Sequence, residues 1–579
     1  MENTNKTGAG QQHPDLIFWI VLLLSALLFC IKSLLVTDIS LVDECYELST
    51  AYRFYLGDAP FVHDWSPQQL QGIVILPAIS LYCGLFHTTE GLVLFVRLFF
   101  LTLKTLLAAV MYLLLKKDDD SFFPVITLLL WFFFTPYNMD TMTYQAMPMV
   151  LLFPAALMLL KKPASRPGLI LTGMFYAISI LSQPFWIVSY PLFLLAGILR
   201  ILSERKQAAN GKSSDQKVIR GLLFWHIGIG IVFILFCLCL LKRTNPSSVI
   251  SNIPYMFAEQ DHDVAGNGIG HMIYQHVILV YGEMLITHLP VTLINGIYLM
   301  LLIFLKDKRK QLSGGMMICL VLSQISLFFT GKPHYMNMFW IPFVWTGIQL
   351  LFYCRKKDYL SLLLSAHVFA AMVALGTDTG SHATSAGFCL PGLVAMLFMG
   401  RAFATPSSGE KQGFAKAADV MIKRCLPLIT VTLCLLLHVL ITWGSVVSKA
   451  DFAFPIKEGP MKHLYASEAR YIAYTMELED IKSLNLSKED VLFCGLSNPL
   501  AYLDAGVIPG SLATLFPTAD MEHQKLYYRM HPDHFPTKVY YDVRLPEDFL
   551  SDPDMKEMFG QGTMRYLTYG TVIETGRSK

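Results

Sequence analysis

The chain has 579 residues, of which 54% are hydrophobic and only 15% are charged, and its mean hydropathy is +0.48. Soluble domains carry roughly 25% charged residues, so this composition excludes a soluble enzyme, a disordered scaffold and a nucleic-acid-binding protein. The net charge of +2 gives no reason to expect a polyanionic partner. The apolar residues lie in long blocks, and blocks of ~18 or more residues are typical of transmembrane helices.

These blocks predict an α-helical polytopic membrane protein with about 13 transmembrane helices, each near the ~20 residues that cross the hydrocarbon core. We expect the spans at residues 16–36, 91–115, 122–136, 141–160, 167–183, 185–202, 220–241, 284–305, 313–330, 336–354, 359–375, 385–400 and 425–445. A further apolar block, residues 72–86, is shorter and contains Pro77. We expect it to form a juxtamembrane helix in the first outer loop, residues 37–90.

The basic residues indicate the orientation of the spans. If the 72–86 block does not cross, all large basic clusters share one side, and the opposite loops hold only Arg53, Lys242, Arg243 and Lys332. The positive-inside rule then places the N-terminus in the cytoplasm. Thirteen spans would leave the C-terminus outside a bacterial cell membrane. The shared clusters lie at residues 116–117, 161–166, 200–220, 306–310, 355–357 and 401–424.

The sequence divides into a transmembrane domain, residues 1–445, and a tail, residues 446–579, that alone has a soluble composition. Runs typical of strands occur in the tail at residues 490–495, 538–543 and 570–575, and a helical pattern occurs at residues 499–506. Strands that alternate with helices predict a small extracytoplasmic α/β domain.

The sharpest local feature is a pair of acidic residues, Asp43 and Glu44, just after the first span. Two adjacent carboxylates at a membrane boundary need a partner or a wet cavity, because their desolvation is costly. One interpretation is a general base with an ionised neighbour, and the other is a solvated acidic loop. The residues that follow favour the first interpretation.

After the acidic pair come a Tyr- and Ala-rich segment, a Gly57-x-x-Pro60 turn, and the stretch His63-Asp64-Trp65-Ser66-Pro67. This order resembles the GT-C superfamily of integral membrane glycosyltransferases, which includes protein O-mannosyltransferases and the lipid A aminoarabinose transferase. The resemblance covers the whole chain in architecture and is specific in motifs around residues 43–67. Two further segments are similar to family features. They are the polar turn that ends at Asp140 and the stretch Lys332-Pro333-His334-Tyr335 before a late helix.

The resemblance implies an inverting glycosyltransferase that moves a sugar from a polyprenyl-phosphate-linked donor to an acceptor on the outer face of the membrane. Asp43 would take the proton of the acceptor hydroxyl, with Glu44 beside it, because an inverting transfer needs one base. Cations and donors must meet the charge of the leaving phosphate. Candidates for that role are Arg97, Lys332, His334 and Tyr335, with Lys32 also considered. Candidates for shaping the site or binding the acceptor are His63, Asp64 and Asp140.

A second polar cluster, residues 258–263, contains Glu259, Asp261, His262 and Asp263. Together with Asp64, His262 could bind a divalent metal, because carboxylates suit hard cations and imidazole suits zinc. A solvated loop is the other interpretation, since no spacing typical of metal ligands occurs here.

Two other functions use the same class of lipid. A transporter or flippase for a lipid-linked glycan intermediate should have repeat symmetry and charges in the middle of its spans, and the sequence has no evident repeat. A polymerase or ligase of surface glycan usually has a large late outer loop, whereas the large loop here is the first. For the preferred function, the acceptor can be a glycan, a lipid or a protein.

Overall fold

The computed structural model describes most of the chain. The described parts are residues 12–36, 43–66, 68–116, 123–134, 140–160, 165–191, 194–195, 213–257, 282–329, 335–353, 428–433, 452–495, 498–515 and 521–576, with a few single residues between them. The predicted spans at 359–375 and 385–400 lie outside these parts, as does much of those at 185–202 and 425–445.

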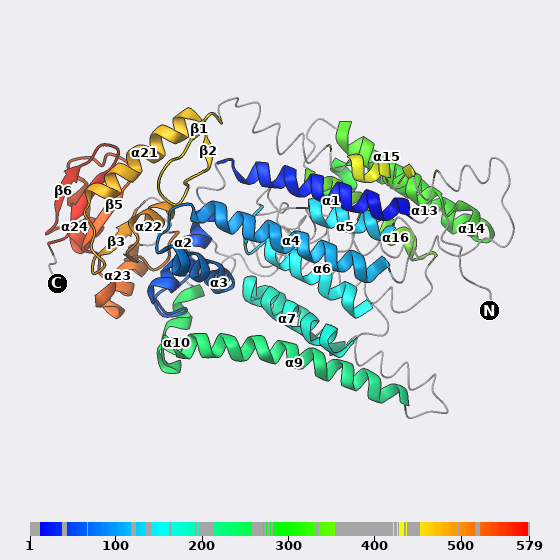
Figure 1. Ribbon diagram of the computed structural model, residues 1–579, viewed down its shortest axis with the longest axis horizontal. Coiled ribbons are helices and arrows are strands. Elements are labelled where there is room, and N and C mark those ends of the chain that lie inside the picture. The colour runs from blue at the N-terminus through cyan, green and yellow to red at the C-terminus, as the bar shows by residue number, and fades with distance from the viewer. Residues whose placement is uncertain are drawn as a thin grey trace.

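A bundle of apolar helices forms the larger part of the molecule (Figure 1). Each of its helices lies over a block that the sequence predicts as a span. They are α1 (Gln12–Ser33), α4 (Leu92–Lys116), α5 (Phe123–Phe133), α6 (Ala146–Leu160), α7 (Arg166–Ser182), α9 (Ser213–Leu241), α13 (Leu289–Phe304), α15 (Gly315–Phe329) and α16 (Tyr335–Leu350). Short segments also occur: η3 (Pro184–Ser189), α10 (Pro246–Asn252), η4 (Ile253–Phe257), η6 (Glu283–Thr287), η7 (Lys306–Lys308) and α14 (Arg309–Leu312).

Four of the described helices are long and apolar enough to cross a membrane, judged by length and composition. Three of them, α1, α4 and α9, belong to the bundle, and the fourth is α3 (Gln69–Phe86). Six further apolar helices are shorter. The chain is therefore a multi-pass membrane protein, and the total of about 13 spans stays a prediction.

Helix α3 begins and ends on the same side of the bundle. Before it, the amide of Trp65 donates to the carbonyl of Leu512 at 2.7 Å; after it, the amide of Gly91 donates to the carbonyl of Gly459 at 3.0 Å. Both acceptors belong to the C-terminal region. In Figure 1, α2 (Cys45–Leu56) and α3 lie at the end of the bundle beside that region. An 18-residue helix spans about 27 Å, so its two ends could not both reach this region if α3 crossed the bundle.

Small residues let α7 and α9 pack closely. A Cβ atom at Gly173 would lie 2.0 Å from the carbonyl oxygen of Trp225, and one at Gly228 would lie 2.0 Å from that of Ile170. Glycine at these positions brings the two backbones into contact, as is common between helices in membranes. At the start of α7, the Ser165 hydroxyl caps the helix by accepting from the amide of Gly168 at 3.2 Å.

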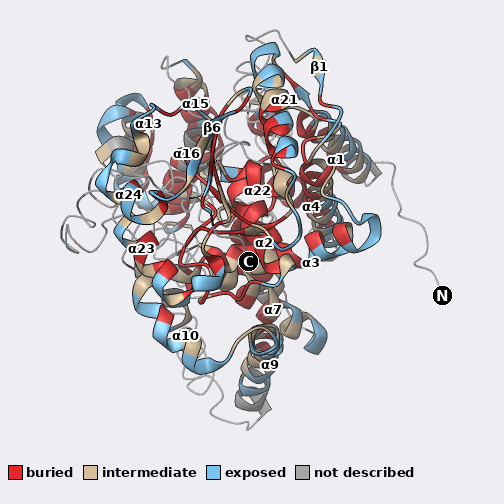
Figure 2. Ribbon diagram, turned by 90° about the vertical axis from the view of Figure 1, so that its left-hand side faces the viewer, coloured by how far each residue is buried: buried red, intermediate tan, exposed pale blue. Residues whose placement is uncertain are grey.

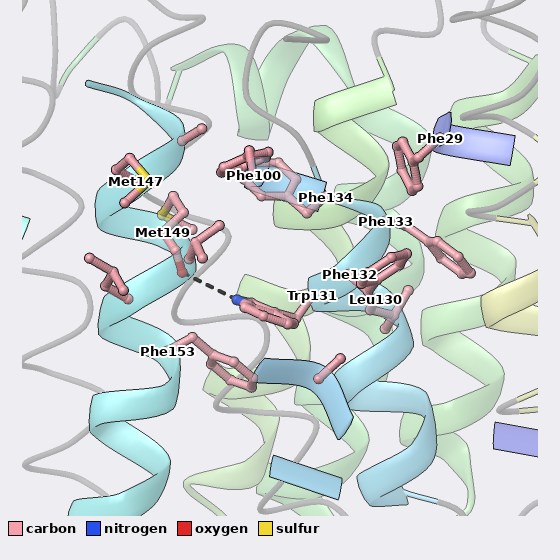
Figure 3. Close-up of a cluster of buried hydrophobic side chains, with 14 of the residues drawn as sticks. Phe29, Phe100, Leu130, Trp131, Phe132, Phe133, Phe134, Met147, Met149 and Phe153 are labelled. Carbon is pink, nitrogen blue, oxygen red and sulfur yellow. Dashed lines mark hydrogen bonds between the residues drawn. The ribbon is translucent and has the colours of Figure 1, made fainter. Parts of the chain in front are cut away.

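Aromatic side chains fill the centre of the bundle between α1, α4, α5 and α6 (Figure 3). The rings of Phe29 and Phe132 meet edge to face with centroids 5.5 Å apart, and Trp131 stacks on Phe153 at 6.0 Å. The indole of Trp131 donates to the carbonyl of Met149 at 3.2 Å. Large rings in such contacts hold these helices at fixed positions.

The C-terminal region forms a mixed five-stranded sheet in the order β4-β3-β5-β7-β6. Strands β4, β3 and β5 are parallel, whereas β7 pairs antiparallel with both β5 and β6. The predicted strands are confirmed as β3 (Val491–Cys494), β5 (Lys538–Tyr541) and β7 (Thr571–Glu574), and the predicted helix as α22 (Leu500–Ala505). The remaining elements are α21 (Glu468–Ser483), β4 (Ile508–Pro509), α23 (Met521–Met530), η9 (Pro532–His534), η10 (Phe549–Ser551), α24 (Pro553–Phe559) and β6 (Thr563–Tyr566).

The sheet domain packs directly on the first outer loop. A short hairpin of β1 (Phe454–Pro455) and β2 (Tyr465–Ala466) joins it to the bundle, where Tyr465 bridges to Leu35 after α1. Buried residues gather around α2 and α22 in the middle of Figure 2. The core of the bundle continues through α2 to Leu500 and Leu503 of α22. Helix α2 is therefore buried between the membrane helices and the sheet domain.

Candidate active site

Asp43 and Glu44 form the turn that leads into α2, at the end of the bundle next to the sheet domain. Glu44 is buried, with 2% of its surface exposed, and Arg97 of α4 binds it through the Nε and Nη2 atoms of its guanidinium group. The Arg97 Nη2 to Glu44 Oε2 distance is 2.6 Å, and the Nε to Oε1 distance is 2.9 Å. The Nη1 atom of Arg97 also donates to the carbonyls of Ser33 and Leu35, at 2.8 Å each.

Arg97 therefore ties the start of α4 to the end of α1 and to the start of α2. Asp43 directly precedes this anchor, and its own side chain is exposed. Partial desolvation by the surrounding atoms raises the pKa of the Asp43 carboxyl. The positive end of the α2 dipole lies beside Asp43 and acts against this rise.

Two buried lysines lie behind this anchor, inside the bundle. Lys32 of α1 forms an ion pair with Asp140. Lys104 lies halfway along α4, is 3% exposed, and donates to the carbonyl of Phe134 at 2.9 Å. Its ammonium group also lies 5.6 Å from the ring centroids of Phe29 and Phe132. Buried charges at this depth are costly and often mark a functional site.

A third acid of α2, Glu47, is buried beside the pair. The amide of Tyr144 donates to its Oε1 atom at 2.9 Å. Its Oε2 atom has no hydrogen-bond partner in the described part of the chain. Burial raises the pKa of Glu47 well above its ordinary value, against the lowering effect of the Tyr144 amide.

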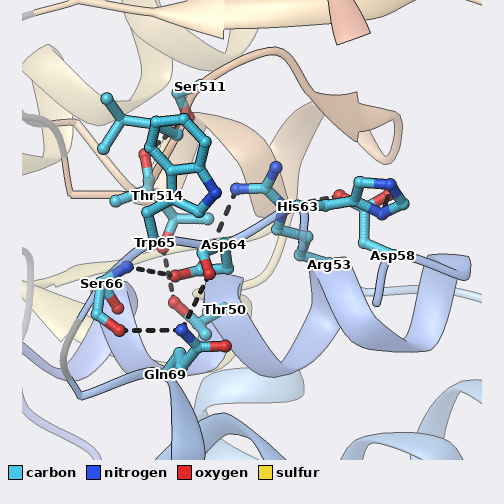
Figure 4. A network of polar contacts seen from close by, with 12 residues as sticks. Thr50, Arg53, Asp58, His63, Asp64, Trp65, Ser66, Gln69, Ser511 and Thr514 are labelled. Carbon is cyan, nitrogen blue, oxygen red and sulfur yellow. Dashed lines mark hydrogen bonds and ion pairs between the residues drawn. The ribbon is translucent and has the colours of Figure 1, made fainter. Parts of the chain in front are cut away.

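A separate polar network joins the first outer loop to the sheet domain (Figure 4). Arg53 of α2 is completely buried and donates to Asp58 Oδ2 at 2.5 Å and to the Tyr527 hydroxyl at 2.7 Å. Its Nη1 atom lies 3.7 Å from Asp64 Oδ2. Thr50 and Thr514 share a hydrogen bond of 2.7 Å across the same interface. The loop is thus held to the domain by buried charged and polar contacts.

At the edge of this network, Asp58 Oδ1 faces two histidines. His534 Nε2 donates to it at 2.9 Å, and His63 Nδ1 lies 3.6 Å away. One ligand atom from each of these three residues lies within 4.8 Å of the other two, so the group can hold a metal ion. Burial would raise the pKa of Asp58, but Arg53 and His534 outweigh it and the pKa is lowered. Burial lowers the pKa of His63 to about 4.

The site residues predicted from sequence fall into three groups. Asp43, Glu44 and Arg97 come together, with Asp140 paired to Lys32 behind them. His63 and Asp64 lie in the interface with the sheet domain, where Asp64 faces Arg53. Lys332, His334 and His262 lie outside the described residues, and for Tyr335 the structure describes only the backbone, in α16. The expected pairing of Asp64 with His262 at a metal thus stays untested, and the described cluster uses other residues.

Sequence reasoning missed Lys104, Arg53 and Glu47 as site candidates, and it did not connect His534 with the first outer loop. A lysine in the middle of an apolar span is itself a signal for Lys104. Arg53 could have been noticed as the single basic residue among the acids of its loop. No local pattern marks His534, because its partners lie more than 470 positions away in the sequence.

Among the solved structures that are similar to this chain are two membrane enzymes. One is the oligosaccharyltransferase AglB of Archaeoglobus fulgidus in complex with an inhibitory peptide and a dolichol-phosphate; it is 12% identical, with 91% of this chain and 69% of that chain covered and a TM-score of 0.43. The other is ArnT of Cupriavidus metallidurans bound to undecaprenyl phosphate, with 12% identity, 97% and 98% coverage and a TM-score of 0.48. Both belong to the GT-C superfamily. No family model matches the chain, and no curated protein matches it.

Proposed function

We propose that this protein is an inverting glycosyltransferase that moves a sugar from a polyprenyl-phosphate donor to an acceptor on the extracytoplasmic face of the membrane. The observation that carries the proposal is the acid pair at the end of the bundle next to the sheet domain. An exposed Asp43 is followed by a buried Glu44 that Arg97 holds at 2.6 Å. The resemblance of residues 43–67 to the GT-C motif order supports the same function.

Asp43 is the general base of the proposed reaction. Its exposed carboxylate can accept the proton of an acceptor hydroxyl while that oxygen attacks the anomeric carbon of the donor. The bond between the anomeric carbon and the phosphate oxygen then breaks, and polyprenyl phosphate leaves with the bonding electrons. A base needs a fixed position as well as a suitable pKa, and the anchored Glu44 provides that position for its neighbour.

The cations at the end of α1 and in the first half of α4 are suited to an anionic lipid phosphate. Lys32, Arg97 and Lys104 interact electrostatically with one another or with Asp140. Two of these three cations are paired with carboxylates: Arg97 with Glu44 and Lys32 with Asp140. A phosphate would balance the remaining positive charge as it leaves. Lys332, His334 and Tyr335 are proposed to complete this phosphate site and Asp140 to shape it, whereas His63 and Asp64 are proposed to shape the acceptor side of the active site.

The arrangement of α3 supports the proposed orientation. Since α3 returns to the side on which it began, the end of α1 and the start of α4 lie together, as the Arg97 contacts with Ser33 and Leu35 require. At the opposite end of the same two helices, Lys116 pairs with Asp15. The positive-inside rule assigns that basic end to the cytoplasm, so the acid pair and the sheet domain would face outward. A transporter or flippase is the alternative function, and among the described residues the buried Lys104, halfway along α4, is a feature expected of it.

The replacement Asp43→Asn tests the base directly. It keeps the shape of the side chain and removes the basic oxygen, so turnover should fall by ~100-fold or more, while thermal stability stays that of the wild type. The assay is release of polyprenyl phosphate from a panel of polyprenyl-phosphate sugars, with the purified chain in lipid nanodiscs.

A matched control is Glu90→Gln in the same loop, because Glu90 is half exposed and pairs with Lys462 at the surface. That variant should retain full turnover. Wild-type turnover in Asp43→Asn with any active donor would refute Asp43 as the base. Absence of release from every polyprenyl-phosphate donor, together with movement of the intact lipid-linked substrate across the bilayer when the chain is reconstituted in closed vesicles, would favour the transporter instead.

A further inference from the structure

The first outer loop and the sheet domain share a cluster of three side chains that could hold a metal ion. Asp58 and His63 lie in the loop after α2, and His534 lies at the end of η9 in the sheet domain. Asp58 and His534 are 3% and 4% exposed, whereas about a fifth of the His63 side chain is open to solvent. The cluster is therefore buried at Asp58 and His534 and reaches solvent at His63.

The distances within the cluster suit a small transition-metal ion. With Zn–N and Zn–O bonds of about 2.0–2.2 Å, tetrahedral ligands lie roughly 3.3–3.5 Å from one another. Asp58 Oδ1 lies 2.9 Å from His534 Nε2 and 3.6 Å from His63 Nδ1, values on either side of that spacing. Shifts of a few tenths of an ångström would thus bring Asp58 Oδ1 to ligand spacing from each histidine, and all three ligand atoms lie within 4.8 Å of one another.

The surroundings prepare the three groups for this role. The Nε atom of Arg53 donates to Asp58 Oδ2, which leaves Oδ1 directed at the histidines. Between them, Phe61 adopts a φ of 65°, the left-handed region that non-glycine residues rarely use, and this turn brings His63 back toward Asp58. The amide of Ala59 donates to His63 Nδ1 at 3.0 Å, so this nitrogen carries no proton, and a metal ion bound there would take its lone pair in place of that hydrogen bond.

We propose that Asp58, His63 and His534 bind one Zn²⁺ ion that fastens the sheet domain to the first outer loop. Imidazole nitrogens with one carboxylate oxygen suit zinc, and water fills the fourth position. Because α2 connects Asp58 with the acid pair at residues 43–44, the ion fixes the loop that carries the proposed base. The site differs from the pairing of Asp64 with His262, and it does not depend on the proposed function.

The experiment measures zinc in the full chain, purified without an affinity tag of histidines. Wild-type protein dialysed against zinc and then against buffer should retain about one equivalent by elemental analysis. Replacement of the zinc by Co²⁺ should produce the visible absorption of a tetrahedral site. His63→Gln and His534→Gln should each weaken binding by at least the ~10–100-fold that loss of an outer-shell partner costs. Chelation should make the sheet domain of the wild type easier to release by protease.

His531→Gln is the matched control, because His531 lies in the same group of rings, with its centroid 5.3 Å from that of His63, but its Nε2 atom contacts Asn252. It should bind zinc as the wild type does. Wild-type protein that retains no zinc and gives no tetrahedral Co²⁺ spectrum would overturn the proposal, and this result does not depend on how the variants fold. Equal zinc binding by wild type and both triad variants, or loss of binding in His531→Gln, would overturn the assignment to these residues.

Discussion

The replacement Glu44→Gln separates the anchor of the acid pair from its chemistry. Arg97 makes three hydrogen bonds with the Glu44 carboxylate, at 2.6, 2.9 and 3.1 Å, and its other arm is held by two carbonyls of the α1 end. Glutamine keeps the size of the side chain, but it leaves the Arg97 charge buried without a counter-charge. It also turns a donor toward the guanidinium.

The cost of this change follows from the burial of both partners, which are 2% and 6% exposed. Removal of one partner from a buried ion pair typically costs 3–5 kcal/mol, so we expect the free energy of unfolding to fall by about that amount. The loss should persist at high salt, because solvent ions do not screen a buried pair. Turnover should fall as well, since Asp43 loses its fixed position.

The assay is denaturant unfolding of the purified chain in detergent micelles, followed by the fluorescence of its tryptophans, beside the polyprenyl phosphate release assay. Glu458→Gln serves as a control because its partner is Lys482 in an exposed pair, and it should unfold at the wild-type midpoint. A Glu44→Gln variant as stable as the wild type would show that Arg97 does not depend on Glu44. Asp43→Asn should behave in the opposite way, with lost turnover and unchanged stability.

Two further predictions concern pH and topology. Burial, partly offset by the Tyr474 hydroxyl, raises the pKa of Asp504 from 3.8 to about 7. Between these values the folded chain holds a proton that the unfolded chain releases, so stability falls as pH rises, by up to about 4 kcal/mol at ~1.4 kcal/mol per unit. The variant Asp504→Asn should not show this loss. In thermal unfolding the variant should be more stable than the wild type above the raised pKa and equally stable below pH 3.8. Equal stability of the two proteins at all pH values would contradict the argument. For topology, a cysteine at Lys482 should react in intact cells with an impermeant thiol reagent while one at Lys308 should not, and the reverse labelling would invert the proposed orientation.

Part of the candidate site could be predicted from the sequence. The acid pair stands out because two adjacent carboxylates follow an apolar span, and this is a local pattern that needs no fold to be noticed. Its partner could be proposed only as a class, a cation near the membrane boundary. The sequence suggested Arg97 as a ligand of phosphate, whereas the structure adds that Arg97 is already bound to Glu44 and to the end of α1.

The sequence by itself determined the elements whose signal is local. Long apolar runs predicted α4 at residues 91–115, where the helix spans Leu92–Lys116, and alternating residues predicted β3, β5 and β7 within two residues of their ends. These predictions succeed because helix and strand periodicity depends on neighbours along the chain. The charge asymmetry of the loops likewise indicated that the 72–86 block stays on one side, and the contacts at both ends of α3 agree with this.

Only the tertiary structure decided which distant side chains meet. The Glu44–Arg97 pair joins residues 53 positions apart, and the bond between Asp58 and His534 joins residues 476 positions apart. No periodic pattern relates such positions. These residues come together because both ends of α3 lie on the same side of the bundle and because the sheet domain packs against α2. Burial of these charged groups between two large apolar cores then fixes their pairing, because an unpaired charge there would cost several kcal/mol.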